Sequence, residues 1–207
     1  RACTRLGVRF EMESEVLAVE NGADGRLLRF RDGEGRVRDA RHAAIVVCAG
    51  IGSRKLARSL GDRLNVYPVK GYSITVNLQD AASQEGAPRI SLLDDATKIV
   101  TSRLGENRFR VAGTAEFAGE NRDIRDCRVQ PLVAWVRRHF PDVSTRHCVP
   151  WAGLRPMLPS MMPKVGPGRN PGVFYNTGHG HLGWTLSSAT AELVAQHPPL
   201  HLADLVR

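Results

Sequence analysis

The sequence predicts a mixed α/β (α+β) fold, with one part built on a buried parallel sheet and another on an antiparallel sheet. Residues 43–50 form a continuous apolar run that ends in glycine, which is typical of a parallel strand buried on both faces. Residues 176–185, NTGHGHLGWT, follow a short apolar run and precede an apolar-periodic segment, the pattern of a strand, a glycine loop and a helix. From Val66 onward apolar and polar residues alternate, most cleanly over residues 72–78, as in antiparallel strands with one wetter face.

The elements before the buried run are expected to be short strands. Residues 7–20 alternate, with a break near Ser14, and turn-forming residues at 21–25 and 32–35 separate the strand patterns that follow. This spacing predicts a small β-meander.

Three helices and a loop are expected further along the chain. Ser53 should cap a short helix that Gly61 ends. Residues 129–140 have helical periodicity, with Pro131 tolerated in the first turn, and residues 151–158 are expected to be an apolar loop. Half-buried strand patterns lie between the helix that Gly61 ends and the helix over residues 129–140, at residues 89–93, 99–103 and 109–113. The final helix should carry one apolar face, formed by Leu182, Leu186, Ala189 and Leu193.

Composition narrows the function classes. With 207 residues, 42% of them hydrophobic, the chain can form one large domain or two small ones. No apolar stretch has the length of a membrane span and no export signal is evident, so a cytoplasmic protein is expected. The net charge of +8 is spread along the chain with few aromatic residues nearby, which favours an acidic membrane surface or an anionic cofactor over nucleic acid. The scattered cysteines are expected to be reduced thiols: Cys3, Cys48, Cys127 and Cys148.

The glycine loop is the first candidate site. Three glycines between residues 178 and 183 let the backbone approach a ligand closely, and a helix that begins near Gly183 presents free N–H groups to it. This predicts a site for an anion or a polarised oxygen. The alternative is a tight turn in which the glycines serve only steric needs.

Arg155 is the second candidate, because it is the one charge in the apolar residues 151–159. A buried guanidinium requires an anion, and its planar fork suits a carboxylate. The alternatives are an exposed arginine or an internal salt bridge. Tyr72 could offer its hydroxyl to a ligand, although a core aromatic is favoured.

Other chemistries find little support. His179 and His181 lack a third metal ligand at suitable spacing, so no metal site is expected. The G-x-G fragments at 50–52 and 166–168 do not continue into a dinucleotide fingerprint, and no G-x-S-x-G nucleophile pattern occurs.

Three separated blocks, residues 66–75, 151–157 and 176–185, together resemble the D-amino acid dehydrogenases of the FAD-dependent D-amino acid oxidase and glycine oxidase superfamily. The resemblance implies a Rossmann-type FAD-binding domain, residues 1–65 and 150–207, interleaved with an antiparallel-sheet substrate domain, residues 66–149. The family's N-terminal G-x-G-x-x-G segment is absent from this sequence. The chain is therefore expected to be the C-terminal part of a longer enzyme.

The resemblance also implies roles for single residues. Val16 resembles the family valine whose backbone meets the adenine, and Ala49 and Gly50 resemble the strand end beside the cofactor. Arg155 is similar to the arginine that clamps the substrate carboxylate, Tyr72 to a pocket residue, and His181 to a polar neighbour of substrate or flavin. The residues expected around the flavin ring are Gly178, His179, Gly180, Leu182, Gly183, Trp184 and Thr185. Residues 159–163 depart from the family's usual T-P-D-G-x-P, so the conformation of this loop is open.

The activity implied is oxidative deamination of a D-amino acid, by hydride transfer to FAD, to a 2-oxo acid and ammonia. The partners implied are an amino acid substrate and a quinone or respiratory electron acceptor, with possible peripheral attachment to the membrane. One alternative is an oxygen-using glycine, sarcosine or D-amino acid oxidase. An alternative of another class is a non-catalytic fragment that cannot hold FAD.

Overall fold

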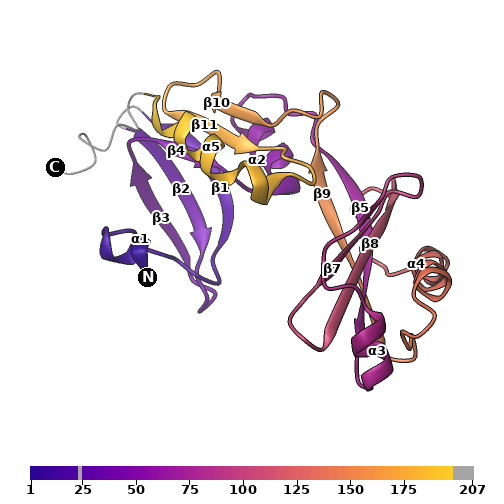
Figure 1. Cartoon of the computed structure of the whole chain (residues 1–207). Helices are drawn as coiled ribbons and strands as arrows, with labels where there is room; N and C mark the ends of the chain where they lie inside the picture. Colours follow the sequence, from indigo (N-terminus) through magenta and orange to yellow (C-terminus); the bar gives the residue numbers. More distant parts are fainter. Residues whose placement is uncertain (23–24, 198–207) are drawn as a thin grey trace. The chain divides into compact units, whose positions relative to one another are not determined.

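The computed structural model describes residues 1–22 and 25–197 (Figure 1). The chain forms two compact units, Arg1–Val66 with the residues from Met157 onward, and Tyr67–Pro156. Each unit has its own hydrophobic core. Among the described residues, none of the helices combines the length and the apolarity that a membrane span requires.

An antiparallel meander begins the first unit, as predicted. Its strands follow α1 (Ala2–Arg5) and are β1 (Glu15–Gly22), β2 (Gly25–Arg31) and β3 (Val37–His42), paired in that order. The expected strand over residues 7–14 is wrong, because those residues form no strand and Val8, Phe10 and Met12 are exposed. Alternation produces a strand only where a partner strand and a core are present to use it.

The second sheet of this unit contains the parallel pair. Its strands, in spatial order, are β10 (Lys164–Pro167), β11 (Val173–Thr177) and β4 (Ile45–Val47). β4 runs parallel to β11, with Phe174 opposite Val46, which confirms the parallel strand expected from residues 43–50, although it is shorter. β10 is antiparallel to β11.

Helical segments follow the two parallel strands. They are the 3-10 helix η1 (Gly50–Gly52), then α2 (Ser53–Ser59), and after β11 the helix α5 (Gly183–Ala195). Ser53 does not cap α2, because it lies inside the first turn and the preceding residue Gly52 is the N-cap. Gly61, with φ of +76°, lets the chain leave α2 as expected.

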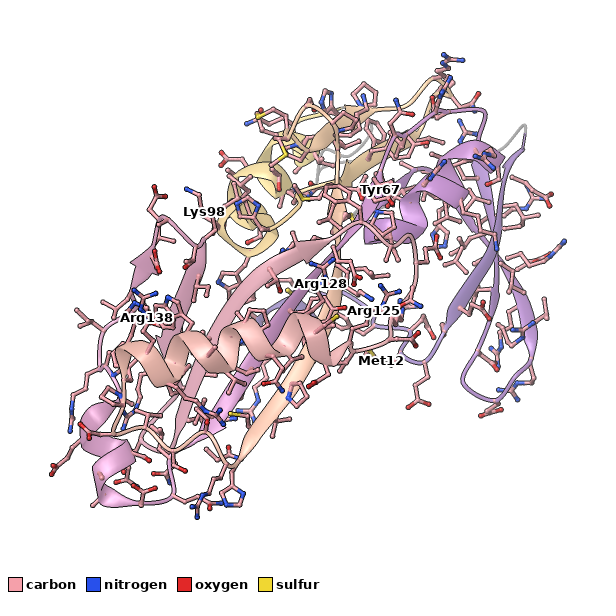
Figure 2. The ribbon with its side chains drawn as sticks, turned by 90° about the vertical axis from the view of Figure 1, so that its right-hand side faces the viewer. Met12, Tyr67, Lys98, Arg125, Arg128 and Arg138 are labelled. Atoms are coloured by element: carbon pink, nitrogen blue, oxygen red, sulfur yellow. The ribbon has the colours of Figure 1, made fainter. Side chains whose placement is uncertain are left out.

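The second unit is a five-stranded sheet with a helix packed on one face (Figure 2). The strand order is β6 (Leu93–Asp94), β7 (Ile99–Arg103), β8 (Arg108–Glu116), β5 (Tyr67–Asn77) and β9 (Cys148–Met157). The helix α4 (Asp126–His139) packs on β5 and β8, and a short helix, α3 (Ala81–Gly86), follows β5. The core between sheet and α4 includes Tyr72, Ile74 and Val76 of β5 and Leu132 and Val136 of α4.

Three expectations in this unit are wrong. Residues 151–158 are not a loop, since up to Met157 they form β9, and the prolines are accommodated because β9 lies at the edge of the sheet. Pro131 lies in the second turn of α4, because the helix begins at Asp126. The strand expected over residues 89–93 is not formed, since only Leu93 of these residues lies in a strand, β6.

The loop after β9 has a strained residue that gives a testable prediction. Met161 has φ of +60°, a left-handed conformation that favours glycine, and it stands where the family pattern T-P-D-G-x-P has its glycine. Met161→Gly should raise the free energy of unfolding by roughly 0.5–1 kcal/mol, because relief of strain exceeds the added chain entropy. Denaturant unfolding would measure it. Met162→Gly is the control, since Met162 does not have a positive φ and should lose stability; equal effects would contradict the explanation.

Candidate cofactor and substrate sites

The carboxyl ends of β4 and β11 lie at one edge of their sheet, because the two strands are parallel neighbours. Each end leads through glycine into a helical segment, Gly50 into η1 and α2, and Gly178 into the loop before α5. In open α/β sheets this edge is where ligands bind. The sequence predicted both loops as cofactor neighbours, and the fold brings them to the same edge.

A hydrogen bond between buried hydroxyls joins the two loops. Ser53 Oγ and Thr177 Oγ1 are 2.8 Å apart, and Thr177 Oγ1 also lies 3.3 Å from the carbonyl oxygen of Gly50. Both side chains are buried. The first residue of α2 is therefore fixed to the last residue of β11, which holds the two glycine loops together. Local sequence patterns do not predict this contact, because the two residues are far apart in the chain.

The glycines of the loop after β11 have a steric purpose. Gly178 and Gly180 have φ of +81° and +58°. A Cβ on Gly178 would lie 2.6 Å from Leu158 Cδ1, and a Cβ on Gly180 would lie 2.5 Å from Met157 Sδ. The steric alternative thus accounts for these two glycines. Gly183 is different, because its nearest neighbour would be 3.5 Å away, an ordinary contact.

The two histidines of the loop have different environments. His179 is half-buried, its Nε2 lies 3.2 Å from Thr190 Oγ1 of α5, and burial lowers the pKa of its imidazole. This side chain holds the loop to the helix. His181 is exposed and remains accessible to a ligand. Among the described residues no three metal-ligating side chains come together.

The first turn of α5 is open. No side chain caps the helix at Leu182, and the first N–H groups of a helix have no acceptor within it. The Trp184 side chain is 93% exposed, and Leu182 and Thr185 are also exposed. Contrary to expectation, the helix packs through Thr190 and Val194, while Leu193 is exposed. This uncapped end has free donors and the helix dipole, which suit the electron-rich edge of a planar cofactor ring.

The other predicted cofactor neighbours in this unit, Val16, Ala49 and Gly50, are exposed or partly exposed. Val16 lies in β1 opposite Phe30, beside an irregularity in the pairing of the strands, and its side chain is 42% exposed. Ala49 is exposed after β4, and Gly50 has φ of +54° with nothing near enough to meet a Cβ. None of these three residues is buried, so a ligand can reach each of them.

In the second unit, Arg155 has the environment of an anion-binding residue. It lies on β9, and its guanidinium covers Gly71 of β5 so closely that a Cβ there would be 2.6 Å from Nη1. Burial lowers the pKa of Arg155, and among the described residues no carboxylate forms a salt bridge with it and no acceptor a hydrogen bond. Neither a fully exposed arginine nor an internal salt bridge describes it. A half-buried guanidinium without an acceptor is suited to an external carboxylate.

The strands around Gly71 are irregular. Gly71 pairs with Ala115 and Tyr72 with Gly113, so Thr114 is an additional residue in β8. Thr114 has φ of +52°, and its buried Oγ1 has no partner among the described residues. Bulges and strained residues cluster at functional sites. The absence of a side chain at Gly71 and the bulge beside it make room for the Arg155 guanidinium.

Tyr72 is buried, with its hydroxyl directed into the unit. Its OH donates to Glu116 Oε2 at 2.6 Å. Lys70 Nζ lies 3.0 Å from the same oxygen, and Arg125 Nη1 donates to Glu116 Oε1 at 2.7 Å. This geometry favours the core-aromatic alternative for Tyr72. Lys70 and Glu116 are not among the residues predicted from the sequence, although a lysine within an apolar strand is a usable signal.

The geometry defines a class of two-unit α/β protein. One unit has glycine loops at the carboxyl ends of parallel strands, and the other is an antiparallel sheet that carries the half-buried Arg155. The chain belongs to the FAD dependent oxidoreductase family, whose model matches residues 1–197.

Named relatives agree with this membership. The chain is 57% identical over 195 residues to D-amino acid dehydrogenase 3 of Mesorhizobium japonicum, covering 94% of this chain and 47% of that protein. It is 42% identical over 192 residues to the D-amino acid dehydrogenase of Sinorhizobium medicae, covering 92% and 44%. The chain thus spans about half the length of these relatives.

Solved structures show the same fold. Glycine oxidase from Geobacillus kaustophilus superposes with a TM-score of 0.75 over 88% of this chain and 47% of that chain, at 24% identity. The expected mixed fold of the glycine oxidase type, with antiparallel sheets, is confirmed.

Proposed function

We propose that this chain supplies the substrate-binding and ring-facing half of an FAD-dependent D-amino acid dehydrogenase. The single observation that carries the proposal is Arg155, a half-buried guanidinium without an acceptor among the described residues. Its fork binds the substrate α-carboxylate, the group common to all amino acids. The similarity to named D-amino acid dehydrogenases supports the choice of substrate.

The chemistry is oxidative deamination. FAD, when bound, accepts a hydride from the substrate Cα. The amino group loses a proton as the Cα–N bond becomes an imine, and water then hydrolyses the imine to a 2-oxo acid and ammonia. We further propose that the electrons pass on to a quinone or respiratory carrier and that the enzyme works in the cytoplasm or at the inner face of the membrane. The protein orients the substrate, and no acid or base side chain is required for this step.

Residues of the first unit fit the cofactor. We assign the N–H groups of Gly183, Trp184 and Thr185 to the ring edge where negative charge grows on reduction. The exposed residues Val16 and Ala49 suit contacts with the rest of the cofactor. We assign the compact unit that contains these residues as the FAD-binding domain and the unit Tyr67–Pro156 as the substrate domain.

The experiment compares two proteins, the 207-residue chain and the longer protein that carries it with the additional length of its relatives. We expect the longer protein to hold about one flavin and to reduce an artificial dye with D-alanine. The isolated chain should bind FAD weakly or not at all, because the family's pyrophosphate-binding segment has no counterpart in it. A longer protein that holds no flavin or does not reduce the dye would refute the proposed function. Stoichiometric flavin in the isolated chain would refute the expectation that this chain alone binds FAD weakly.

An oxidase is the second candidate, because the fold is that of a glycine oxidase. The electron acceptor separates the two. A dehydrogenase gives little hydrogen peroxide in air and rapid dye reduction, whereas peroxide formed in proportion to substrate consumed would identify an oxidase.

A further inference from the structure

One face of the sheet in the second unit carries two arginines. Tyr72 and Ile74 of β5 point toward α4, so Gly71 and Ser73, which alternate with them, lie on the opposite face. Arg155 lies over Gly71 on this opposite face. A second arginine, Arg110 of β8, reaches the same face, where its Nη2 donates to Ser73 Oγ at 3.0 Å.

The environment of Arg110 leaves its charge uncompensated. Its guanidinium lies 5.3 Å from the centre of the Trp151 ring, and among the described residues no carboxylate forms a salt bridge with it. Ser73 takes one of the five N–H donors of a guanidinium. Two other carboxylates of the unit are engaged elsewhere, since Glu116 pairs with Lys70 and Asp94 accepts a hydrogen bond from Trp135. Arg110 is therefore oriented by a hydroxyl and a ring but has donors to spare.

The Trp151 ring lies beside the N–H donors of Arg110. It comes from β9, two positions before Gly153, and a Cβ on Gly153 would lie 2.7 Å from Trp151 Cζ2. The six-membered ring of the indole therefore lies close over the glycine, while 54% of the Trp151 residue stays exposed. A flat, partly exposed ring next to a guanidinium can support the carbon chain of a bound molecule.

The spacing of the two guanidinium groups follows from the strand. Arg155 is fixed over Gly71 and Arg110 at Ser73, two residues further along one face of β5. With a rise of about 3.4 Å per residue, these anchoring positions are roughly 7 Å apart. Each guanidinium can receive one carboxylate, so the pair suits a small molecule with two carboxylates joined by a short carbon chain.

We propose that Arg110 is a specificity-determining residue that binds an anionic side chain of the substrate. Arg155 holds the α-carboxylate, Arg110 the side-chain carboxylate, and Trp151 the carbons between them. The substrate class is then D-amino acids with acidic side chains, such as D-glutamate and D-aspartate. This inference rests on the proposed function and specifies its substrate.

The test uses the complete flavin-loaded enzyme and compares kcat/KM for D-glutamate, D-aspartate and D-alanine. In Arg110→Gln, kcat/KM for the acidic substrates should fall tenfold or more, about the effect of one lost hydrogen bond to a charged group, while D-alanine changes less than about threefold. Arg110→Lys should retain part of the preference. Arg138→Gln is the matched control, because Arg138 is exposed near the far end of α4 (Figure 2).

A binding measurement separates recognition from chemistry. Glutarate and acetate would be titrated against the flavin absorbance of the enzyme, and Arg110→Gln should weaken glutarate about tenfold but leave acetate unchanged. An equal loss for D-alanine and D-glutamate, or an unchanged ratio between them, would overturn the role of Arg110 while dye reduction with D-alanine still supports the dehydrogenase. A wild-type enzyme that oxidises no D-amino acid would remove both proposals.

Discussion

Replacing Arg155 by methionine should lower kcat/KM for D-amino acids about a hundredfold or more, chiefly through a higher KM. Two charge-assisted hydrogen bonds to the α-carboxylate are lost, and each contributes about tenfold. Arg155→Lys keeps the charge but not the planar fork, so an intermediate loss is expected. Steady-state kinetics of the complete enzyme with D-alanine would measure both.

The thermal stability of Arg155→Met should not fall together with its activity. Burial lowers the pKa of Arg155, and no acceptor among the described residues compensates it, so its charge opposes folding. Arg155→Met should therefore leave the melting temperature unchanged or raise it, with unchanged flavin content. Arg146→Met is the control, since Arg146 is exposed in the same unit, and this substitution should change neither the melting temperature nor KM. A KM like that of the wild type would exclude Arg155 from substrate binding.

The sequence predicted the parts of the fold that depend on local pattern. The parallel strand at residues 45–47 and the helix from Asp126 to His139 follow from apolar runs and helical spacing, which act over neighbouring residues. The predictions for residues 7–14 and for β9 are wrong because their structure depends on distant parts of the chain. Alternation and proline content do not say whether a partner strand is available, and that is decided by distant parts of the chain.

The candidate site divides in the same way. Arg155 could be identified because a single charge in an apolar stretch is visible in the sequence. The contacts of Tyr72 with Glu116, and of Arg110 with Ser73, join residues more than thirty positions apart, and only the register of β5 and β8 brings them together. Side-chain function within a sheet thus depends on pairing that local patterns leave open.

The buried pair of Lys70 and Glu116 gives the second large expected effect. Both side chains are almost inaccessible, and they lie on β5 and β8 beside Gly71, the residue under Arg155. Glu116→Gln keeps the shape and an acceptor for Tyr72 but leaves the Lys70 charge buried without its anion. Breaking one partner of a buried pair is strongly destabilising, so the melting temperature should fall by roughly 10 °C.

The matched control is an exposed pair in the same unit. Lys98, labelled in Figure 2, forms a salt bridge with Asp95, and both side chains are largely exposed. Asp95→Asn should shift the melting temperature by less than about 3 °C, because exposed pairs contribute little. The double variant Lys70→Met with Glu116→Gln should recover part of the loss, since it removes the unpaired charge. Equal shifts in Glu116→Gln and Asp95→Asn would contradict the importance of the buried pair.

The pH dependence provides an independent check of this pair. Hydrogen bonds from Tyr72 and Lys70 lower the pKa of Glu116, so its contribution is complete above its ordinary pKa of about 4.3 and is lost as pH falls through the lowered value. Burial alone would lower the pKa of Lys70, but its bonds to Glu116 and Tyr72 outweigh burial and raise it. Its contribution is therefore complete below about pH 10.4 and is lost as pH rises through the raised value. The difference in unfolding free energy between wild type and Glu116→Gln should thus be constant from roughly pH 5 to 7 and shrink in acid. A difference that instead grows as pH falls below 4 would show that Glu116 is not held as a carboxylate by this cluster.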